Sequence, residues 1–160
     1  MRKTYIALVF ALTFLEAQTF VDTTTRLEWQ DDASVKKDWQ GAIAYCKNLS
    51  LKGKSDWRLP SIEELLSITD DTKYDPAIKS GFKNVVSGYY WSSSSDASLA
   101  GTAWLVDFYD GNDGTYYKSG ELYVRCVRDS DTLNIDSFAT LYEGGARTDH
   151  GISAKTASTE

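Results

Sequence analysis

Apolar residues recur at helical spacing in two short stretches of the first half of the chain. In the first stretch, Asp38 is followed by apolar side chains three and four residues apart: Trp39, Ala42, Ile43, Cys46 and Leu49. This spacing predicts a helix with one buried face and Asp38 as its N-cap.

The second helix is predicted to begin abruptly after a proline. Pro60 disfavours the α conformation at Leu59, so a helix starts beyond it. Ser61 and Glu64 have the spacing of a capping box, in which each side chain binds a backbone N–H of the first turn. Helical spacing of Ile62, Leu65, Leu66 and Ile68 extends this helix to about residue 68. Residues 76–82 are expected to add a short helical turn.

Alternating apolar residues predict strands before and after these helices. Two short strands are expected at 20–22 and 27–29, around a threonine-rich turn. Four more are expected in the second half, at 89–93, 103–108, 115–118 and 122–128. In one of them Val106 and Phe108 share an apolar face with Trp104, while Asp107 points the other way. Helices followed by an antiparallel sheet indicate an α+β domain.

Residues 1–17 have the pattern of a secretory signal peptide. Arg2 and Lys3 precede an apolar run from Ile6 to Leu15, which is shorter than the roughly 20 residues that span a bilayer. The alternative is a buried N-terminal strand or helix. We therefore expect a secreted, periplasmic or cell-surface protein with no membrane span after cleavage. Residues 18–128 would form the domain and residues 129–160 a polar tail.

Charge narrows the range of partners. The formal net charge is −6, and loss of Arg2, Lys3 and Glu16 with the signal would take it to −7. Nucleic-acid binding needs clustered Lys and Arg, so no nucleic-acid partner is expected. The same acidity weakens any general attraction to sulfated polysaccharides.

The chain has two cysteines, Cys46 on the first predicted helix and Cys126 on the last predicted strand. In an exported protein such a pair favours a disulfide over two buried thiols, which are the alternative. Closure of so long a loop would stabilise the fold by about 4 kcal/mol in the chain-entropy model.

The chemistry-bearing residues do not form a catalytic or metal-binding motif. The single histidine, His150, lies in the tail, so neither a Ser-His-Asp nor a Cys-His arrangement can form in the domain. Asp107, Asp110, Asn112 and Asp113 offer oxygen ligands suited to calcium. Yet they lack the EF-hand pattern, and these residue types are usual in turns. We expect no enzymatic activity, no cofactor and no metal site.

Two segments rich in tyrosine, serine and aspartate are the predicted ligand-binding surface. Tyrosine gives large, rigid contact area with a polar tip, and serine and asparagine give adaptable hydrogen bonds, as in antibody paratopes. The alternative is that these residues merely suit exposed strands and turns. The predicted binding residues are Tyr89, Tyr90, Ser94, Asp96, Asp107, Tyr109, Asp110, Asn112, Asp113, Tyr116 and Tyr117.

Five motifs in order resemble a known bacterial family. They are Ala-Ile-Ala-Tyr-Cys at 42–46, Asp-Trp-Arg-Leu-Pro at 56–60, Tyr-Trp-Ser-Ser at 90–93, Ala-Trp-Leu-Val-Asp-Phe at 103–108 and Tyr-Val-Arg-Cys-Val-Arg at 123–128. In these the chain is similar to the family named for the C-terminal domain of the Legionella collagen-like adhesin. The match covers roughly residues 20–128.

The resemblance implies a C-type-lectin-like fold, with two main helices packed on a twisted antiparallel sheet and a bridge between Cys46 and Cys126. It places Trp57, Trp91 and Trp104 in the core rather than at a ligand. It also implies an exported, non-catalytic domain for adhesion to a glycan or a surface protein. The alternatives are an enzyme akin to the formylglycine-generating class, which binds copper through two cysteines close in sequence, and a structural envelope subunit.

Overall fold

The computed structural model describes residues 18–32 and 34–131. The predicted signal peptide and most of the predicted tail, with His150, lie outside these residues. In the described part of the chain, neither helix has the length and apolarity that crossing a membrane requires.

The described residues form an α+β domain in which strands dominate. Its two helices, α1 (Trp39–Lys47) and α2 (Ile62–Leu66), are short, so the expectation of two main helices is not confirmed. The strands are β1 (Gln18–Asp22), β2 (Leu27–Asp31), β3 (Lys36–Lys37), β4 (Tyr89–Ser95), β5 (Thr102–Asp107), β6 (Asp113–Tyr117), β7 (Leu122–Tyr123) and β8 (Val127–Asp129).

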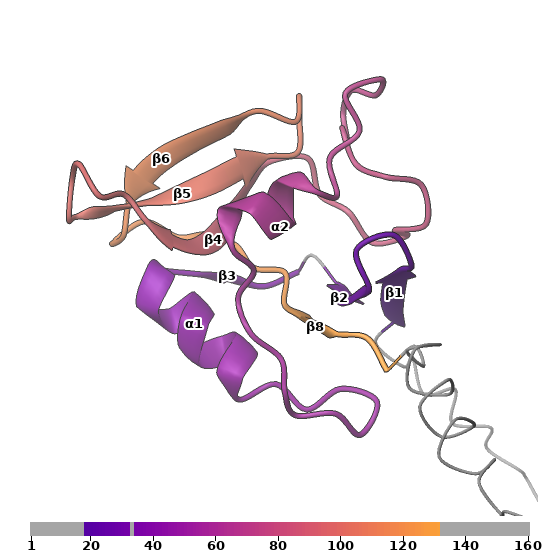
Figure 1. The fold of residues 1–160 in the computed structure, drawn as a ribbon. Helices are drawn as coiled ribbons and strands as arrows, with labels where there is room; N and C mark the ends of the chain where they lie inside the picture. The colour runs from indigo at the N-terminus through magenta and orange to yellow at the C-terminus, as the bar shows by residue number, and fades with distance from the viewer. Residues whose placement is uncertain (1–17, 33, 132–160) are drawn as a thin grey trace, which may run out of the picture. The chain divides into compact units, whose positions relative to one another are not determined.

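The strands form two sheets instead of the single sheet that the sequence predicted. One has the order β1-β2-β8 and the other β3-β7-β4-β5-β6. Neighbouring strands are antiparallel except β4 and β7, which run parallel. Figure 1 shows α2 beside β4 and β5, and α1 beside β3, in agreement with their contacts.

The predicted strand 122–128 is divided between the two sheets. Its first part, β7, pairs with β3 and β4, and its last part, β8, pairs with β2. Between them, Val124 donates its backbone N–H to Val35 O, and Cys126 O accepts from Gln30 N. Because the side chains from Val124 to Arg128 are all buried, their alternation gives no sign of this change of partner.

Both helices begin where the sequence predicted. The Asp38 carboxylate accepts from Gly41 N at 2.7 Å, and Ser61 and Glu64 form a complete capping box. The helical turn expected at 76–82 is absent. Instead Asp75 N and Ala77 N donate to the carbonyls of Tyr109 and Phe108, so this segment lies along the end of β5.

Buried apolar side chains cover both faces of the β4–β5 pair. One cluster joins one face to α1 and to the cysteines. It includes Ala42, Cys46, Trp57, Trp91, Ala103, Leu105 and Cys126. The other joins the opposite face to α2 and β2. It includes Trp29, Leu65, Ile68, Tyr90, Val106 and Phe108. Of the three tryptophans expected in the core, Trp57 and Trp91 are buried and Trp104 is half-buried.

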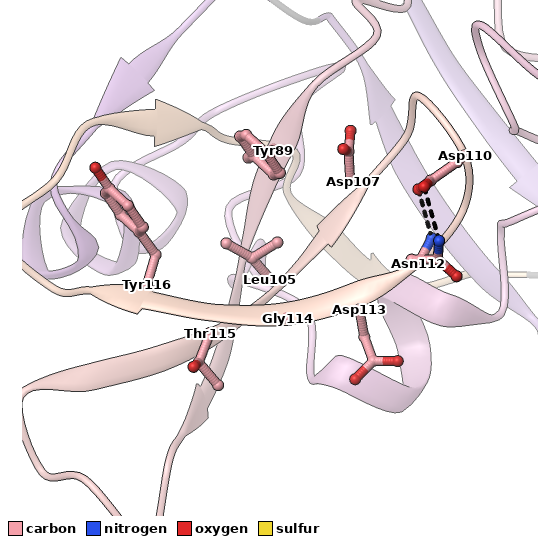
Figure 2. Close-up of a pocket in the computed structure, with 9 residues that line it drawn as sticks. All are labelled: Tyr89, Leu105, Asp107, Asp110, Asn112, Asp113, Gly114, Thr115 and Tyr116. Carbon is pink, nitrogen blue, oxygen red and sulfur yellow. Dashed lines mark hydrogen bonds between the residues drawn. The ribbon is translucent and has the colours of Figure 1, made fainter.

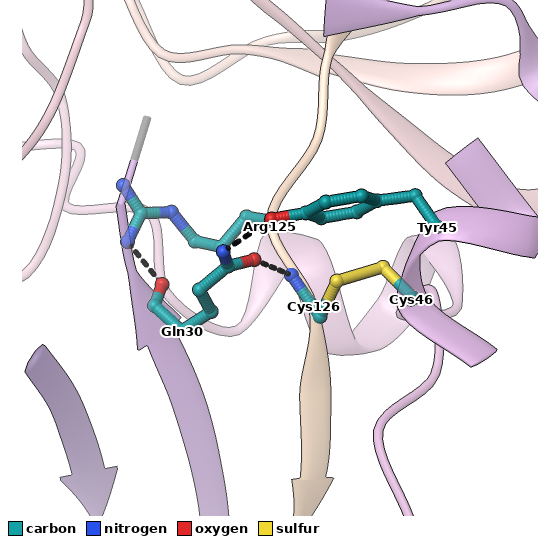
Figure 3. The surroundings of a disulfide bond; sticks show 5 residues. All are labelled: Gln30, Tyr45, Cys46, Arg125 and Cys126. Atoms are coloured by element: carbon teal, nitrogen blue, oxygen red, sulfur yellow. Dashed lines mark hydrogen bonds between the residues drawn. A yellow bond between two sulfur atoms is a disulfide. The ribbon is translucent and has the colours of Figure 1, made fainter. Parts of the chain in front are cut away.

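The predicted disulfide between Cys46 and Cys126 is present, with both residues fully buried. Gln30 of β2 fills the space beside it (Figure 3). Its Nε2 donates to the hydroxyl of Tyr45 at 2.9 Å, and its Oε1 accepts from Cys126 N at 3.3 Å. The bridge therefore ties α1 to the segment that links the two sheets.

Candidate ligand-binding site

The site is built on one face of the β4–β5–β6 ladder, and strand register decides which side chains meet there. Tyr89 pairs with Asp107, and Leu105 pairs with Gly114. Directly paired residues point to the same face, and so do residues two apart along a strand. Tyr116, two residues beyond Gly114, therefore joins the others on this face.

Gly114 leaves a hollow in the middle of this face. It stands between the side chains of Asn112 and Tyr116 and has none of its own, so Leu105 beneath it forms the floor (Figure 2). The resulting pocket has a volume of about 290 Å³. Its lining residues are Tyr89, Leu105, Asp107, Asp110, Asn112, Asp113, Gly114, Thr115 and Tyr116.

Two tyrosine rings stand beside the hollow. Tyr89 is 53% exposed and Tyr116 is 48% exposed, so each offers a large free ring surface. A Cβ on Gly120 would come within 2.3 Å of the Tyr116 ring, which shows that this glycine makes room for the ring. On its inner side, the Tyr116 ring lies 6.4 Å from the buried ring of Trp91.

The other end of the hollow is polar and acidic. Asp107 accepts from Tyr109 N at 2.9 Å. Asp110 accepts from the backbone and side-chain N–H groups of Asn112 at 3.1 and 2.7 Å, which holds this amide in place (Figure 2). Carboxylate and amide oxygens therefore lie next to the tyrosine rings and the apolar floor.

Comparison with known proteins identifies the family. The model of the Lcl C-terminal domain family matches residues 18–128. The chain belongs to the Lcl C-terminal domain family. This membership makes it a bacterial adhesin-associated domain, and it confirms the family resemblance drawn from the sequence motifs. No curated protein matches the chain.

Six of the predicted binding residues of this Lcl C-terminal domain line the hollow together. They are Tyr89, Asp107, Asp110, Asn112, Asp113 and Tyr116. The pairing of Tyr89 with Asp107 brings the two predicted segments side by side, although they are far apart in the sequence.

Tyr90 was wrongly predicted to contact a ligand. It is fully buried, and its hydroxyl donates to Val86 O at 3.0 Å. Its ring stacks on Tyr123 and meets Phe108 edge to face. Burial raises the pKa of its hydroxyl. The strand alternation that exposes Tyr89 turns Tyr90 to the opposite face, into the core around α2.

Three more predicted residues lie away from the hollow. Ser94 accepts from Ile62 N at 3.0 Å and so supports the start of α2. Asp96 accepts from Ser98 N at 2.8 Å and holds the turn that follows β4. Tyr117 is exposed and does not line the hollow, although its ring meets that of Tyr116 at a centroid distance of 6.2 Å.

Tyr109 forms a separate aromatic pair with Tyr74, at a ring-centroid distance of 4.3 Å. Both rings are exposed. Interaction of the two hydroxyls, together with desolvation and the negative charges of Asp110 and Asp75, raises the pKa of Tyr74 to about 12. Tyr109 directly precedes Asp110 in the chain, so this pair adjoins the segment that forms the acidic end of the hollow.

The sequence did not predict Leu105, Gly114 and Thr115 in the lining, or Tyr74 beside Tyr109. The strand expected at 115–118 begins after Gly114, so the sequence predicted a turn at this glycine. The sequence does contain a signal, since Asn112, Gly114 and Tyr116 have the spacing of one strand face. Tyr74 lies in a polar loop and has no comparable signal.

Within residues 18–32 and 34–131, no three side chains of His, Cys, Asp or Glu gather closely enough to hold a metal ion. The Asp110–Asn112 hydrogen bonds close a turn between β5 and β6. These are the turn contacts that the Asp, Asn and Gly residues of this segment favour.

Proposed function

We propose that this chain is an exported bacterial adhesion domain that binds a glycan or a surface protein in the Gly114 hollow, without transforming it. One observation carries the proposal: a glycine in the middle of an exposed strand leaves a hollow between two exposed tyrosine rings. A site of this kind offers shape, apolar contact and fixed polar groups together, as ligand sites do.

The lining suits a sugar better than a flat protein surface. The rings of Tyr89 and Tyr116 and the floor of Leu105 can contact the apolar face of a sugar ring. Asp107 and Asp110 can accept hydrogen bonds from its hydroxyl groups. We therefore give a glycan priority over a protein ligand.

Absence of catalysis is part of the proposal. The copper chemistry of the formylglycine-generating class needs thiolates, whereas Cys46 and Cys126, the two cysteines of the chain, are joined to each other. Titration of free thiols under native conditions tests this point. Two reactive thiols would reopen the enzyme alternative.

An extracytoplasmic location and a C-type-lectin-like relationship complete the proposal. A buried structural disulfide supports export, because such bridges persist in oxidising compartments. A helix-borne cysteine bonded to a late strand segment supports the lectin-like relationship. The predicted signal peptide would direct export.

The test is an array of glycans and bacterial or host surface proteins, probed with the full chain in the presence and absence of calcium. The paired variants are Tyr116→Ala and Tyr117→Ala, which remove neighbouring exposed rings of which only that of Tyr116 lines the hollow. We expect Tyr116→Ala to abolish binding and Tyr117→Ala to retain it. A blank array would favour a structural envelope subunit, and equal loss in both variants would place the site elsewhere.

A further inference from the structure

The acidic end of the hollow has no counter-charge in the described part of the protein. Asp107, Asp110 and Asp113 form no ion pair with any Lys or Arg of residues 18–32 and 34–131. The lining also contains no basic side chain. A ligand that enters the hollow therefore meets a field of negative sign.

The lysine that follows β6, Lys118, has its ammonium directed elsewhere. Lys118 follows Tyr116 by two residues, on the same face of the chain. Its ammonium binds Ser95 Oγ at 2.6 Å and Ala100 O at 2.9 Å, and it lies over the ring of Trp39. These contacts draw its charge toward α1 and away from the carboxylates.

The tyrosine rings beside the hollow favour the same kind of ligand. The face of an aromatic ring attracts a cation, and it also packs against apolar C–H groups. Tyr89 and Tyr116 can therefore accept a group that combines an apolar ring face with a positive charge.

A second aromatic pair, Tyr74 and Tyr109, adjoins the acidic segment. Tyr74 is 62% exposed and Tyr109 is 42% exposed. The backbone bond from Asp75 N to Tyr109 O holds the two segments together at 2.9 Å. Tyr109 lies between Asp107 and Asp110 in the chain, so exposed rings are available next to the carboxylates as well as at the hollow. This arrangement suits a ligand of several units better than one small molecule.

We propose that the hollow binds a polysaccharide of hexosamine units with free, protonated amines, the amine of one unit pairing with Asp107 and Asp110. This inference rests on the proposed function and names its ligand class. N-acetylation removes the charge from each unit, and sulfate or uronate groups would meet the carboxylates as like charges. The site therefore discriminates against acetylated and anionic glycans.

Calorimetric titration of the full chain with three hexasaccharides tests this inference. The probes are a fully deacetylated glucosamine hexamer, the N-acetylated hexamer of the same linkage, and a heparin hexasaccharide. The titrations are run at about pH 5.5, where an amine is protonated. We expect the deacetylated hexamer to bind, with an affinity that falls as salt rises from low to high concentration. The other two should bind at least tenfold more weakly.

Charge-removing variants locate the contact. Asp107→Asn and Asp110→Asn should each weaken binding of the deacetylated hexamer by about threefold to fivefold, the upper part of the range for exposed ion pairs. Glu63→Gln removes an exposed charge from α2, on the opposite side of β4–β5, and should leave the affinity unchanged. Tyr74→Ala should weaken binding of the hexamer but not of a glucosamine dimer.

The outcomes separate this inference from the proposed function. Suppose that the acetylated hexamer binds as tightly as the deacetylated one, and that Tyr116→Ala abolishes this binding. That result would overturn the inference and leave the proposed function in place. Equal binding of hexalysine would replace the sugar with a basic protein ligand. If no hexasaccharide binds, the inference fails. The glycan and protein array then tests the proposed function by itself.

Discussion

Gly114 lies opposite Leu105 in the β5–β6 ladder, and a Cβ added to Gly114 would stand 3.8 Å from Leu105 Cδ1. That is an ordinary van der Waals distance, so the backbone here has room for a Cβ. The first prediction is that Gly114→Val folds as well as the parent, since valine favours strands and glycine weakens them.

The free energy of unfolding of Gly114→Val should lie within about 1 kcal/mol of the parent value, in either direction. Chemical denaturation measures it. A loss of several kcal/mol would mean that the hollow is needed for the fold itself.

Tyr89 and Tyr90 should differ sharply in their effect on stability. Tyr90→Ala removes a buried ring that packs on Tyr123 and Phe108, and should cost about 3–5 kcal/mol. Tyr89→Ala removes an exposed ring and should cost less than about 1 kcal/mol. The urea concentrations at the midpoints of unfolding of the two variants measure this difference, provided that the free energy of unfolding depends on urea with the same slope in both. Similar losses in both variants would contradict the strand register given above.

Removal of the disulfide should destabilise the domain as a whole. Cys46→Ala with Cys126→Ala opens a loop with a sequence separation of 80 residues, for which chain entropy predicts a loss of about 4 kcal/mol. Thermal unfolding of the double variant beside the oxidised parent checks this. An unchanged melting temperature would show that the bridge is dispensable.

The Arg58–Glu64 ion pair should stabilise the fold at neutral pH, and this contribution to the free energy of unfolding should be lost in acid. Two hydrogen bonds of 2.6 and 2.7 Å join the side chains, and this pairing with Arg58 lowers the pKa of Glu64. A carboxyl whose folded-state pKa is lowered stabilises the fold above its unfolded pKa of about 4.3 and loses that contribution as pH falls through the folded value.

Glu64→Gln should therefore cost about 1 kcal/mol at pH 7, through the cap and the ion pair. The difference from the parent should shrink toward about pH 3. Denaturation midpoints at both pH values measure it, with Glu63→Gln as the control on the same helix. A difference that stays constant with pH would show that the charge of Glu64 plays no part.

Local patterns predicted those features of the fold that depend on neighbouring residues. The caps at Asp38 and Ser61 depend on spacings of three residues, and both were found where the sequence placed them. The bridge between Cys46 and Cys126 was likewise predictable, because the chain contains no other cysteine.

Features that depend on distant partners escaped sequence analysis. Tyrosine suits both a core and a surface, and strand β4 lies between two buried clusters, so the alternation that would separate Tyr89 from Tyr90 is weak. Arg125 carries charge yet is fully buried: its guanidinium donates to Gln30 O and Asn84 O and lies beside Asp31. The hollow itself follows from the pairing of Gly114 with Leu105, which only the folded register reveals.

The most direct test of the central claim is the affinity of Gly114→Val for the glycan selected by the array, beside the parent protein and Gly114→Ala. A filled hollow excludes the sugar while the fold and both tyrosines remain. We expect binding to be lost in Gly114→Val and weakened in Gly114→Ala, with the free energy of unfolding within about 1 kcal/mol of the parent value. Full binding by a folded Gly114→Val would contradict it.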